Sequence, residues 1–144
     1  MKEILDHSVN VIAYEKNDKK YAMCAAWCMN VDYDKLMCLL GSQSVTGNNI
    51  KKGDIVGFSS LRIKQKNIAE RIGSNHSNIF NKLDGIDYKL DEGAILISNA
   101  KTMSKCEVID VLHPKGIEVD NLLYLRIIST DFCDDDEFLH MSDF

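Results

Sequence analysis

The sequence lacks any apolar run that could cross a membrane as a helix. Such a helix needs about 18 or more consecutive apolar residues, and every apolar run here is shorter. The opening residues, MKEILDHSVNV, also lack the apolar core of a signal peptide. We therefore expect a cytoplasmic protein with no membrane partner.

Clustered positive charge is also absent, which argues against a nucleic-acid-binding surface. The formal net charge is −5, and six of the 22 acidic residues follow Thr130, where no Lys or Arg occurs. The preceding residues are therefore nearly neutral and have no basic stripe, so we expect no nucleic-acid partner. Residues 131–144 are typical of an acidic, solvated and partly disordered tail. Apolar residues in it could dock on a partner subunit, namely Phe132, Phe138, Leu139 and Phe144.

Cysteine is present, but not in a pattern that makes a disulfide framework or a metal site. The five cysteines are odd in number, and Cys24 and Cys28 are too widely spaced for a CxxC motif. No second Cys or His pair follows, so we expect no metal. Since free Cys behaves as a small hydrophobe, we expect buried, reduced thiols. The positions are Cys24, Cys28, Cys38, Cys106 and Cys133.

Short β-strand patterns dominate the chain, whose length favours a single domain. Residues 9–15 and 22–31 flank a polar turn at 16–19, which predicts a hairpin. Gly57 within a later strand indicates a bulge or a close backbone approach. The further strands are predicted at residues 36–40, 54–60, 94–98, 103–112 and 122–129.

Helical spacing is found only in the middle of the chain. Ile68, Ala69 and Ile72 recur among polar residues in 64–72, which predicts a short helix that ends at Gly73, and a polar loop follows over 74–83. Many strands with one or two short helices favour a closed or nearly closed antiparallel barrel. The predicted fold class is therefore mainly β.

One predicted strand is unusually rich in small residues. The segment YAMCAAWCMNVD (21–32) has Ala or Cys at most of the positions where strands usually carry bulky side chains. Such a strand lets a flat ligand, such as a planar cofactor ring, lie close against the backbone. The alternative is an inner strand kept thin to fit a crowded barrel wall.

A second unusual segment, GSQSVTGNNIKKG (41–53), follows a short apolar strand. Ser42, Ser44 and Thr46 supply three hydroxyls in five residues, and Thr46 is a candidate N-cap for a short helix through Asn49 and beyond. Hydroxyls and amides at a helix N-terminus bind phosphate. The alternative is a polar turn with an ordinary cap.

These features follow one another in an order that resembles the flavin reductase-like family, whose fold is an FMN-binding split β-barrel of the antiparallel Greek-key type. The order and spacing of six segments carry the resemblance: MCAAWCMNV (23–31), SQSVTGNNI (42–50), GFSS (57–60), KQKNIAE (64–70), SNHSNIFNKL (74–83) and AKTMSKCEV (100–108). The resemblance covers about residues 8–130. We therefore divide the chain into a split-barrel domain, residues 1–130, and an acidic C-terminal tail, residues 131–144.

The resemblance implies a homodimer with one FMN per subunit near the dimer interface. The ring would lie along residues 23–28, and the phosphate would lie near residues 42–46. Lys82 is implied as a second phosphate or substrate contact, with Ser74, His76 and Ser77 at the same opening. Trp27 would either stack near the flavin or fill the core. The implied cofactor-binding residues are Met23, Cys24, Ala25, Ala26, Trp27, Cys28, Ser42, Ser44, Thr46, Ser77 and Lys82.

The implied function is that of an FMN-binding oxidoreductase, which accepts hydride from NADH or NADPH and passes electrons to a redox partner protein or a small acceptor. The scattered histidines supply no acid–base pair, and none is required because the cofactor carries the chemistry.

Two departures from the family pattern keep alternatives open. Cys24 stands where a hydroxyl residue commonly precedes the residue matching Ala25, and Asn121 follows Asp120 where many members have an Asp-His pair. Asn does not titrate near neutral pH. The alternatives are an FMN-containing electron-transfer protein without its own NAD(P)H activity, and a split barrel that binds heme or another ligand.

Overall fold

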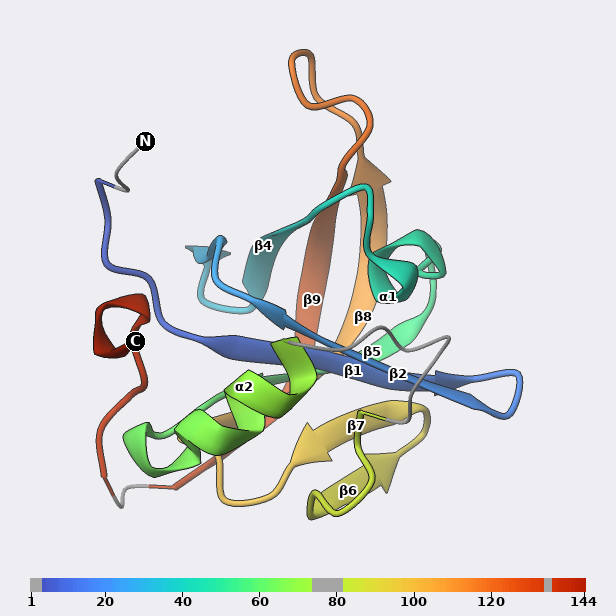
Figure 1. The fold of residues 1–144 in the computed structure, drawn as a ribbon. Helices are drawn as coiled ribbons and strands as arrows, with labels where there is room; N and C mark the ends of the chain where they lie inside the picture. The colour runs from blue at the N-terminus through green and yellow to red at the C-terminus, as the bar shows by residue number, and fades with distance from the viewer. Residues whose placement is uncertain (1–3, 74–81, 134–135) are drawn as a thin grey trace.

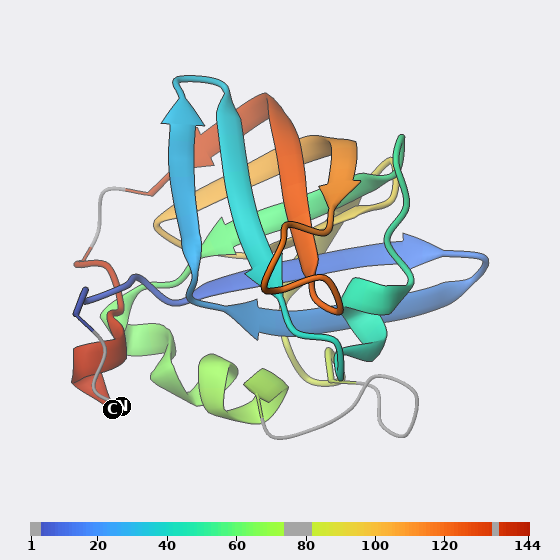
Figure 2. The ribbon, with the colours of Figure 1, turned by 90° about the horizontal axis from the view of Figure 1, so that it is seen from above.

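The computed structural model describes residues 4–73, 82–133 and 136–144. Within them, nine strands form one sheet in the order β3-β4-β9-β8-β5-β1-β7-β6, and β2 pairs with β1. Every one of these pairings is antiparallel. The sheet curls so that β4, β9 and β8 stand across the β1–β2 hairpin (Figure 1), as the view from above also shows (Figure 2). This architecture confirms the mainly β barrel predicted from the sequence.

The elements have the following bounds. The strands are β1 (Asn10–Lys16), β2 (Lys19–Ala25), β3 (Cys28–Asp32), β4 (Lys35–Leu40), β5 (Ile55–Ser60), β6 (Tyr88–Asp91), β7 (Ala94–Ile97), β8 (Thr102–Leu112) and β9 (Asn121–Phe132). The helices are α1 (Val45–Asn48) and α2 (Lys66–Gly73), and single 3₁₀ turns cover Ile63–Gln65 and Met141–Asp143. In the described part of the chain, no helix is long and apolar enough to span a membrane.

The first hairpin forms where the sequence predicts it. β1 and β2 pair in register from Asn10 with Ala25 to Lys16 with Lys19. The two residues between the strands, Asn17 and Asp18, both have positive φ, at 53° and 63°. A two-residue turn with two positive φ angles matches the twist of a hairpin, and Asn and Asp tolerate this conformation better than most residues.

Two apolar cores lie on the two faces of this hairpin. On the barrel side, Met23 and Ala25 pack with interior residues such as Ile12. On the other side, Ala22 contributes to a second core that includes Ile72 of α2. Residues two apart on a strand share a face, so one strand serves both cores. The predicted helix is confirmed, and its buried stripe covers the second core.

Gly57 marks a close approach between strands, as its position within an apolar strand indicates. A Cβ atom at this position would lie 2.0 Å from the main-chain oxygen of Ile95 in β7. β1 pairs with β5 and, at Tyr14, with β7, which brings the three strands together. Only a residue without a side chain fits at this crossing.

The prediction of one continuous strand over residues 22–31 is wrong. β2 ends at Ala25, and β3 begins at Cys28. β2 pairs with β1, whereas β3 pairs with β4, so the chain changes direction between two parts of the barrel wall. The N–H of Cys28 donates to the oxygen of Ala26 at 2.9 Å and closes the bend.

The sequence analysis also missed β6, which pairs with β7 through a tight turn at Glu92 and Gly93, both with positive φ. β6 reads YKLD, and this four-residue segment carries two charged residues and too little apolar periodicity to be recognised.

The expectation of a solvated, partly disordered tail is wrong for residues 136–144. Leu139 is fully buried in the second core. Its oxygen accepts from the N–H of Val9 at 2.8 Å, and its own N–H donates to the oxygen of Leu61 at 2.9 Å. Leu139 therefore docks on its own chain rather than on a partner. Phe132, by contrast, is 74% exposed.

Candidate functional site

A cleft of about 400 Å³ opens where the end of β2 meets the loop that follows β4. Figure 1 shows α1 above and α2 below the β1–β2 hairpin, and both helices contact β2. The cleft walls come from Met23 and Cys24 of β2, from residues 41–46, and from the last residues of α2, with Lys82 and Asp120 added from distant parts of the chain. Its volume lies within the range of small-molecule sites, about 300–1,000 Å³.

The small residues of β2 divide between packing and the cleft. Ala22 and Ala25 are buried, at 1% and 4% exposure, and fill the two cores. These two residues support the packing interpretation of the small-residue strand. Met23 and Cys24 line the cleft, and the Cys24 thiol donates to the main-chain oxygen of Ala69 in α2 at 3.4 Å.

The loop after β4 turns into α1 with a different cap from the predicted one. Ser44, not Thr46, is the N-cap, and its hydroxyl accepts from the N–H of Gly47 at 2.8 Å. The same hydroxyl donates to the sulfur of Met23 at 2.9 Å. Thr46 is 2% exposed, and its hydroxyl donates to the main-chain oxygen of Ala22 at 3.1 Å. Thr46 therefore ties the loop to β2, and the helix ends at Asn48, earlier than predicted.

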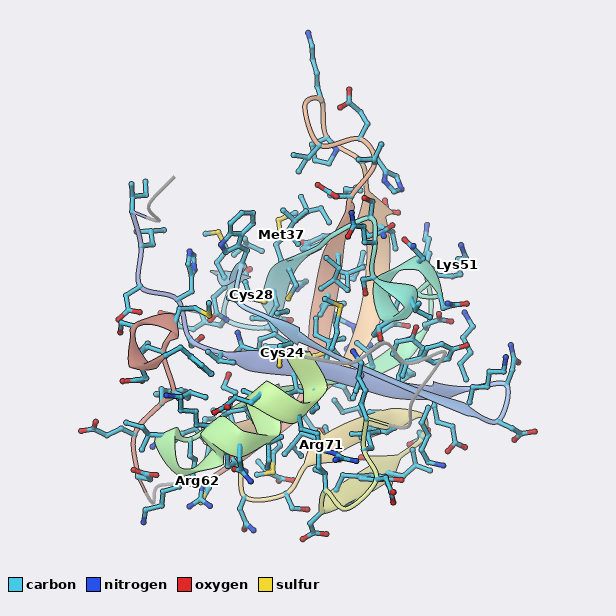
Figure 3. The ribbon with its side chains drawn as sticks, in the orientation of Figure 1. Cys24, Cys28, Met37, Lys51, Arg62 and Arg71 are labelled. Atoms are coloured by element: carbon cyan, nitrogen blue, oxygen red, sulfur yellow. The ribbon has the colours of Figure 1, made fainter. Side chains whose placement is uncertain are left out.

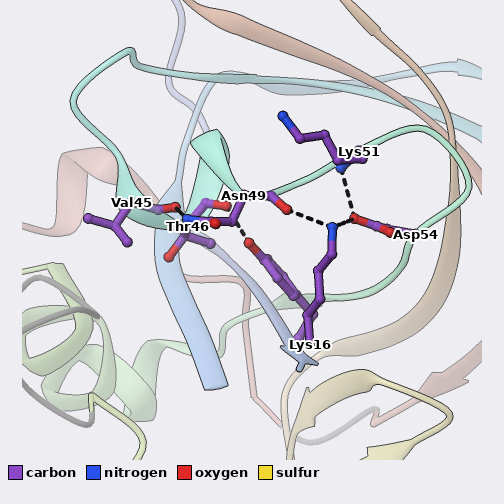
Figure 4. A network of polar contacts seen from close by, with 7 residues as sticks. Lys16, Val45, Thr46, Asn49, Lys51 and Asp54 are labelled. Atoms are coloured by element: carbon purple, nitrogen blue, oxygen red, sulfur yellow. Dashed lines mark hydrogen bonds and ion pairs between the residues drawn. The ribbon is translucent and has the colours of Figure 1, made fainter. Parts of the chain in front are cut away.

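A polar network behind α1 holds this loop in place (Figure 4). The ammonium of Lys16 donates to the main-chain oxygen of Asn49 at 3.0 Å and to the carboxylate of Asp54 at 2.7 Å. The same carboxylate accepts from the N–H of Lys51 at 2.8 Å. Tyr14 adds a buried hydrogen bond from its hydroxyl to the oxygen of Thr46. The loop is therefore fastened to the barrel on the side away from the cleft.

The charged groups of the cleft come from two distant segments. Lys82 is only 8% exposed, and no ion pair among the residues that the structure describes includes it. Burial lowers the pKa of Lys82, and the adjacent Cys24 opposes this shift. A lysine with little exposed surface and no carboxylate partner among the described residues favours an anionic ligand.

Cys24 contributes an uncharged side chain to the cleft wall. Burial raises the pKa of its thiol to about 11, although nearby Lys82 acts in the opposite direction. The thiol therefore keeps its proton near neutral pH.

Asp120 enters the cleft at the start of β9. Its carboxylate accepts from the N–H of Ser42 at 2.9 Å, and its main-chain oxygen lies 2.8 Å from Nδ1 of His113. Sequence reasoning noticed Asp120 only for the residue that follows it, and it did not include Asp120 among the site residues. The position of Asp120 just before a predicted strand was the one available sign of a site residue. Its contact with Ser42 could not be predicted, because the two residues are far apart in the chain.

The structure brings together about half of the predicted site residues. The cleft collects Met23, Cys24, Ser42, Ser44, Thr46 and Lys82. Ala25 faces the barrel core, Ala26 lies in the bend, and Trp27 is 55% exposed, so these three do not line the cleft. Ser77 lies outside the described residues, as do Ser74 and His76.

Cys28 lines a second cavity of about 350 Å³, beyond the bend. Its wall is built from aromatic and hydroxyl side chains such as Phe58, Ser60 and Thr130. The buried polar groups there are already bonded: Ser60 donates to the side-chain oxygen of Asn10 at 2.7 Å. Among the described residues, no group of three or more His, Cys, Asp or Glu side chains could hold a metal ion.

Comparison with known proteins finds similarity in fold but not in sequence family. No protein-family model matches the sequence, and no curated protein matches it. Solved structures do match in fold. An NADH:FAD oxidoreductase of Streptomyces globisporus has a TM-score of 0.83 at 17% identity, over 94% of this chain and 81% of that one. Flavoredoxin from Methanosarcina acetivorans has a TM-score of 0.80 at 13% identity, over 92% and 72%.

An FMN-binding protein from Thermus thermophilus is similar to the same degree, with a TM-score of 0.80 at 15% identity over 92% of this chain and 74% of that one. The three proteins share the arrangement of strands described above across nearly the whole chain, although few residues are identical. The chain therefore has the flavin reductase-like split-barrel fold.

Proposed function

We propose that this protein binds FMN in the cleft and is an oxidoreductase of the flavin reductase type. Bound FMN would supply the redox chemistry, by accepting hydride from NADH or NADPH and delivering electrons to an acceptor. The fold supports this proposal, because similar structures include an NADH:FAD oxidoreductase, also solved with NAD and FAD fragments, and an FMN-binding protein.

The observation that carries the proposal is the joint position of Lys82 and the loop 41–46 at one cleft. Lys82 offers a charged donor with no carboxylate partner among the described residues, and exposed Ser42 adds a hydroxyl. The hydroxyl of Ser44 already donates to Met23. This donor set suits a phosphate monoester, which takes several charge-assisted hydrogen bonds. Thr46 would act by positioning the loop, since its hydroxyl already bonds Ala22.

The ring end of the ligand would lie against β2. Met23 and Cys24 present sulfur-containing, uncharged side chains to the cleft, and Gly73 at the end of α2 adds no side chain. Soft, polarizable side chains adapt well to a planar aromatic surface. The next four residues would not touch the ring, namely Ala25, Ala26, Trp27 and Cys28. They would affect its position only through the conformation of the backbone after Cys24.

A second candidate, an FMN-containing electron-transfer protein without NAD(P)H activity, is favoured by one contact. The side chain of Asn121, which stands where many family members have His, donates to the side chain of Asn48 at 2.9 Å. Neither amide can titrate near neutral pH, so this position offers no acid or base to a nicotinamide substrate. The redox partner would then be a protein or a small acceptor.

One experiment tests the proposal and separates the two candidates. FMN and riboflavin are titrated into flavin-free protein while flavin fluorescence is measured, and the visible spectrum of the complex is then recorded before and after anaerobic NADH or NADPH. Binding followed by bleaching is expected for the reductase. Bleaching by dithionite alone would instead favour the electron carrier. A folded protein that binds neither flavin would overturn both.

A further inference from the structure

Two cysteines outside the cleft face each other across neighbouring strands. Cys28 of β3 is the register partner of Cys38 in β4. The adjacent pair, Trp27 and Leu39, is joined by a hydrogen bond from the N–H of Leu39 to the oxygen of Trp27 at 2.9 Å. Hydrogen-bonded and non-hydrogen-bonded pairs alternate along an antiparallel ladder, so the two cysteines occupy a non-hydrogen-bonded pair, in which Cα atoms lie about 4.5 Å apart.

Both thiols point to the same side of the wall. Cys38 is fully buried in the barrel core, and Cys28 packs against that core. The Cys38 thiol forms a hydrogen bond with Cys28, which together with burial raises the pKa of Cys38 well above its usual value. Disulfides span Cα distances of roughly 4.4–6.8 Å. The expected separation of this pair lies within that range.

Cys28 is also accessible from one side. It is partly exposed and lines the second cavity, together with Asn30 and Leu36. Figure 3 shows Cys24 beside the end of α2 and Cys28 nearer to β4, so the two cysteines belong to different sites. A small oxidant that enters the cavity would therefore meet the sulfur of Cys28 before that of Cys38.

We propose that Cys28 and Cys38 are a site of reversible oxidation, at which hydrogen peroxide converts the two thiols into a cross-strand disulfide. The sulfur of Cys28 attacks one peroxide oxygen, the O–O bond breaks, and the released hydroxide takes the proton of the Cys28 thiol and leaves as water. The sulfur of Cys38 then attacks the resulting sulfenic acid. The S–O bond of Cys28 breaks, and the second hydroxide leaves as water with the proton of Cys38. Two thiols lose two electrons, and one peroxide becomes two waters.

Cys106 and Cys24 do not compete for this pairing. Cys106 lies on β8, and β9 separates β8 from β4. Strands two places apart in a sheet are about 9–10 Å apart, beyond the reach of a disulfide. Cys24 lies on the other face of its strand, where its thiol bonds Ala69. The proposal goes beyond flavin binding and does not depend on it.

The test is made on the complete, fully reduced chain. The folded protein is treated with a series of hydrogen peroxide concentrations, and the remaining thiols are alkylated in denaturant and counted by mass spectrometry. We expect the count to fall from five to three and to return to five after dithiothreitol. Trypsin cleaves after Lys35, so the disulfide should join peptide 21–35 to peptide 36–51, with fragmentation assigning the bond to Cys28.

Three variants make the test specific. Cys28→Ser and Cys38→Ala should each keep all four of their remaining thiols, whereas the control Cys133→Ser should still form the same linked peptides. Far-UV circular dichroism verifies that each variant is folded. If either Cys28→Ser or Cys38→Ala does not fold, the other variant alone is sufficient for the test. The proposal is overturned if wild-type protein keeps all five thiols throughout the series. It is equally overturned if the link uses Cys24, or if it persists in Cys28→Ser.

Discussion

The hydroxyls of the cleft loop differ in what they are free to do. The hydroxyl of Thr46 is buried and donates a hydrogen bond to the main-chain oxygen of Ala22. Ser42 is exposed, and Ser44 is the N-cap of α1. Three similar residues in the sequence thus have three different roles. Lys82, although distant in the chain, is the one cationic side chain among the described residues that line the cleft.

Replacement of Lys82 by Gln should weaken the binding of FMN more than the binding of riboflavin. A hydrogen bond to a charged group contributes about 1.5–3 kcal/mol, so the Kd for FMN should rise roughly 10- to 100-fold. Riboflavin lacks the phosphate, and its Kd should change little. Fluorescence titration measures both constants. Lys19→Gln, at the exposed end of the first hairpin, is the matched control, and an equal loss for the two flavins would contradict the phosphate role.

The buried thiol of Cys106 should make the protein less stable at alkaline pH. Burial raises its pKa from 9.0 to about 12, so the folded state keeps the proton after the unfolded chain has lost it. Stability from this thiol is complete below pH 9 and is lost as the pH rises toward 12. Between pH 9 and 11 the loss should be about 2 kcal/mol.

Urea unfolding at several pH values measures this effect. Cys106→Val should show a shallower decline in the free energy of unfolding between pH 9 and 11 than the wild type does. Cys133→Ser, which changes a less buried thiol, should decline like the wild type. Identical curves for Cys106→Val and the wild type would refute the assignment.

Among the strands, β5 can pack against β7 only because residue 57 is a glycine. Gly57→Ala places a methyl group against the main chain of β7, where 2.0 Å separates the ideal Cβ position from an oxygen. Because the backbone cannot move aside easily, we expect a loss of about 3 kcal/mol or more in the free energy of unfolding. Gly73→Ala is the control, since nothing lies within 4 Å of its Cβ position. Equal stability of the two variants would argue against the crossing of β5 and β7.

The C-terminal segment behaves as an integral part of the second core. Leu139→Ala removes a fully buried side chain and should lower the free energy of unfolding by about 2–5 kcal/mol. Met141→Ala, at a side chain that is 39% exposed in the same segment, should cost less than about 1 kcal/mol. Chemical denaturation distinguishes the two. If both variants unfold like the wild type, the segment does not dock as described.

The whole molecule leaves one face of its sheet uncovered by any described element. Trp27, directly before the edge strand β3, is 55% exposed, and Met29 and Val31 within β3 are 63% and 44% exposed. Met29 pairs with Met37, which pairs with Tyr124, so the apolar surface continues across β4 and β9. We propose that this face binds a second copy of the chain, in keeping with the homodimer implied by the family resemblance. Burial of apolar surface is the main force in such association.

Met29→Lys should convert that dimer into a folded monomer. A charge at the centre of the apolar face would have to be desolvated without a partner. Sedimentation velocity or light scattering measures the change in mass. Val119→Lys, at an apolar residue that is 75% exposed on the β8–β9 connection, should remain dimeric. A wild-type protein that is monomeric at micromolar concentrations would rule out this use of the face.

Much of the fold could be predicted from local pattern, and less of the cleft. The hairpin turn at Asn17 and Asp18, the glycine of β5 and the helix before Gly73 follow from residue type and spacing, which act over a few neighbours. The helix cap was placed two residues too late, because Ser44 and Thr46 are both good caps and only the contact with Ala22 distinguishes them. Asp120 was not predicted as a cleft residue, because its place there depends on a contact with the distant residue Ser42.

The amino-acid order alone established a mainly β chain with a small-residue strand and a hydroxyl-rich loop, because strand periodicity and turn chemistry are properties of short segments. Folding in three dimensions settled the break between β2 and β3, the burial of Leu139, and the meeting of Met23, Ser44 and Lys82 at one cleft. Each of these depends on contacts between residues that are distant in the chain, and local preference carries no information about such contacts.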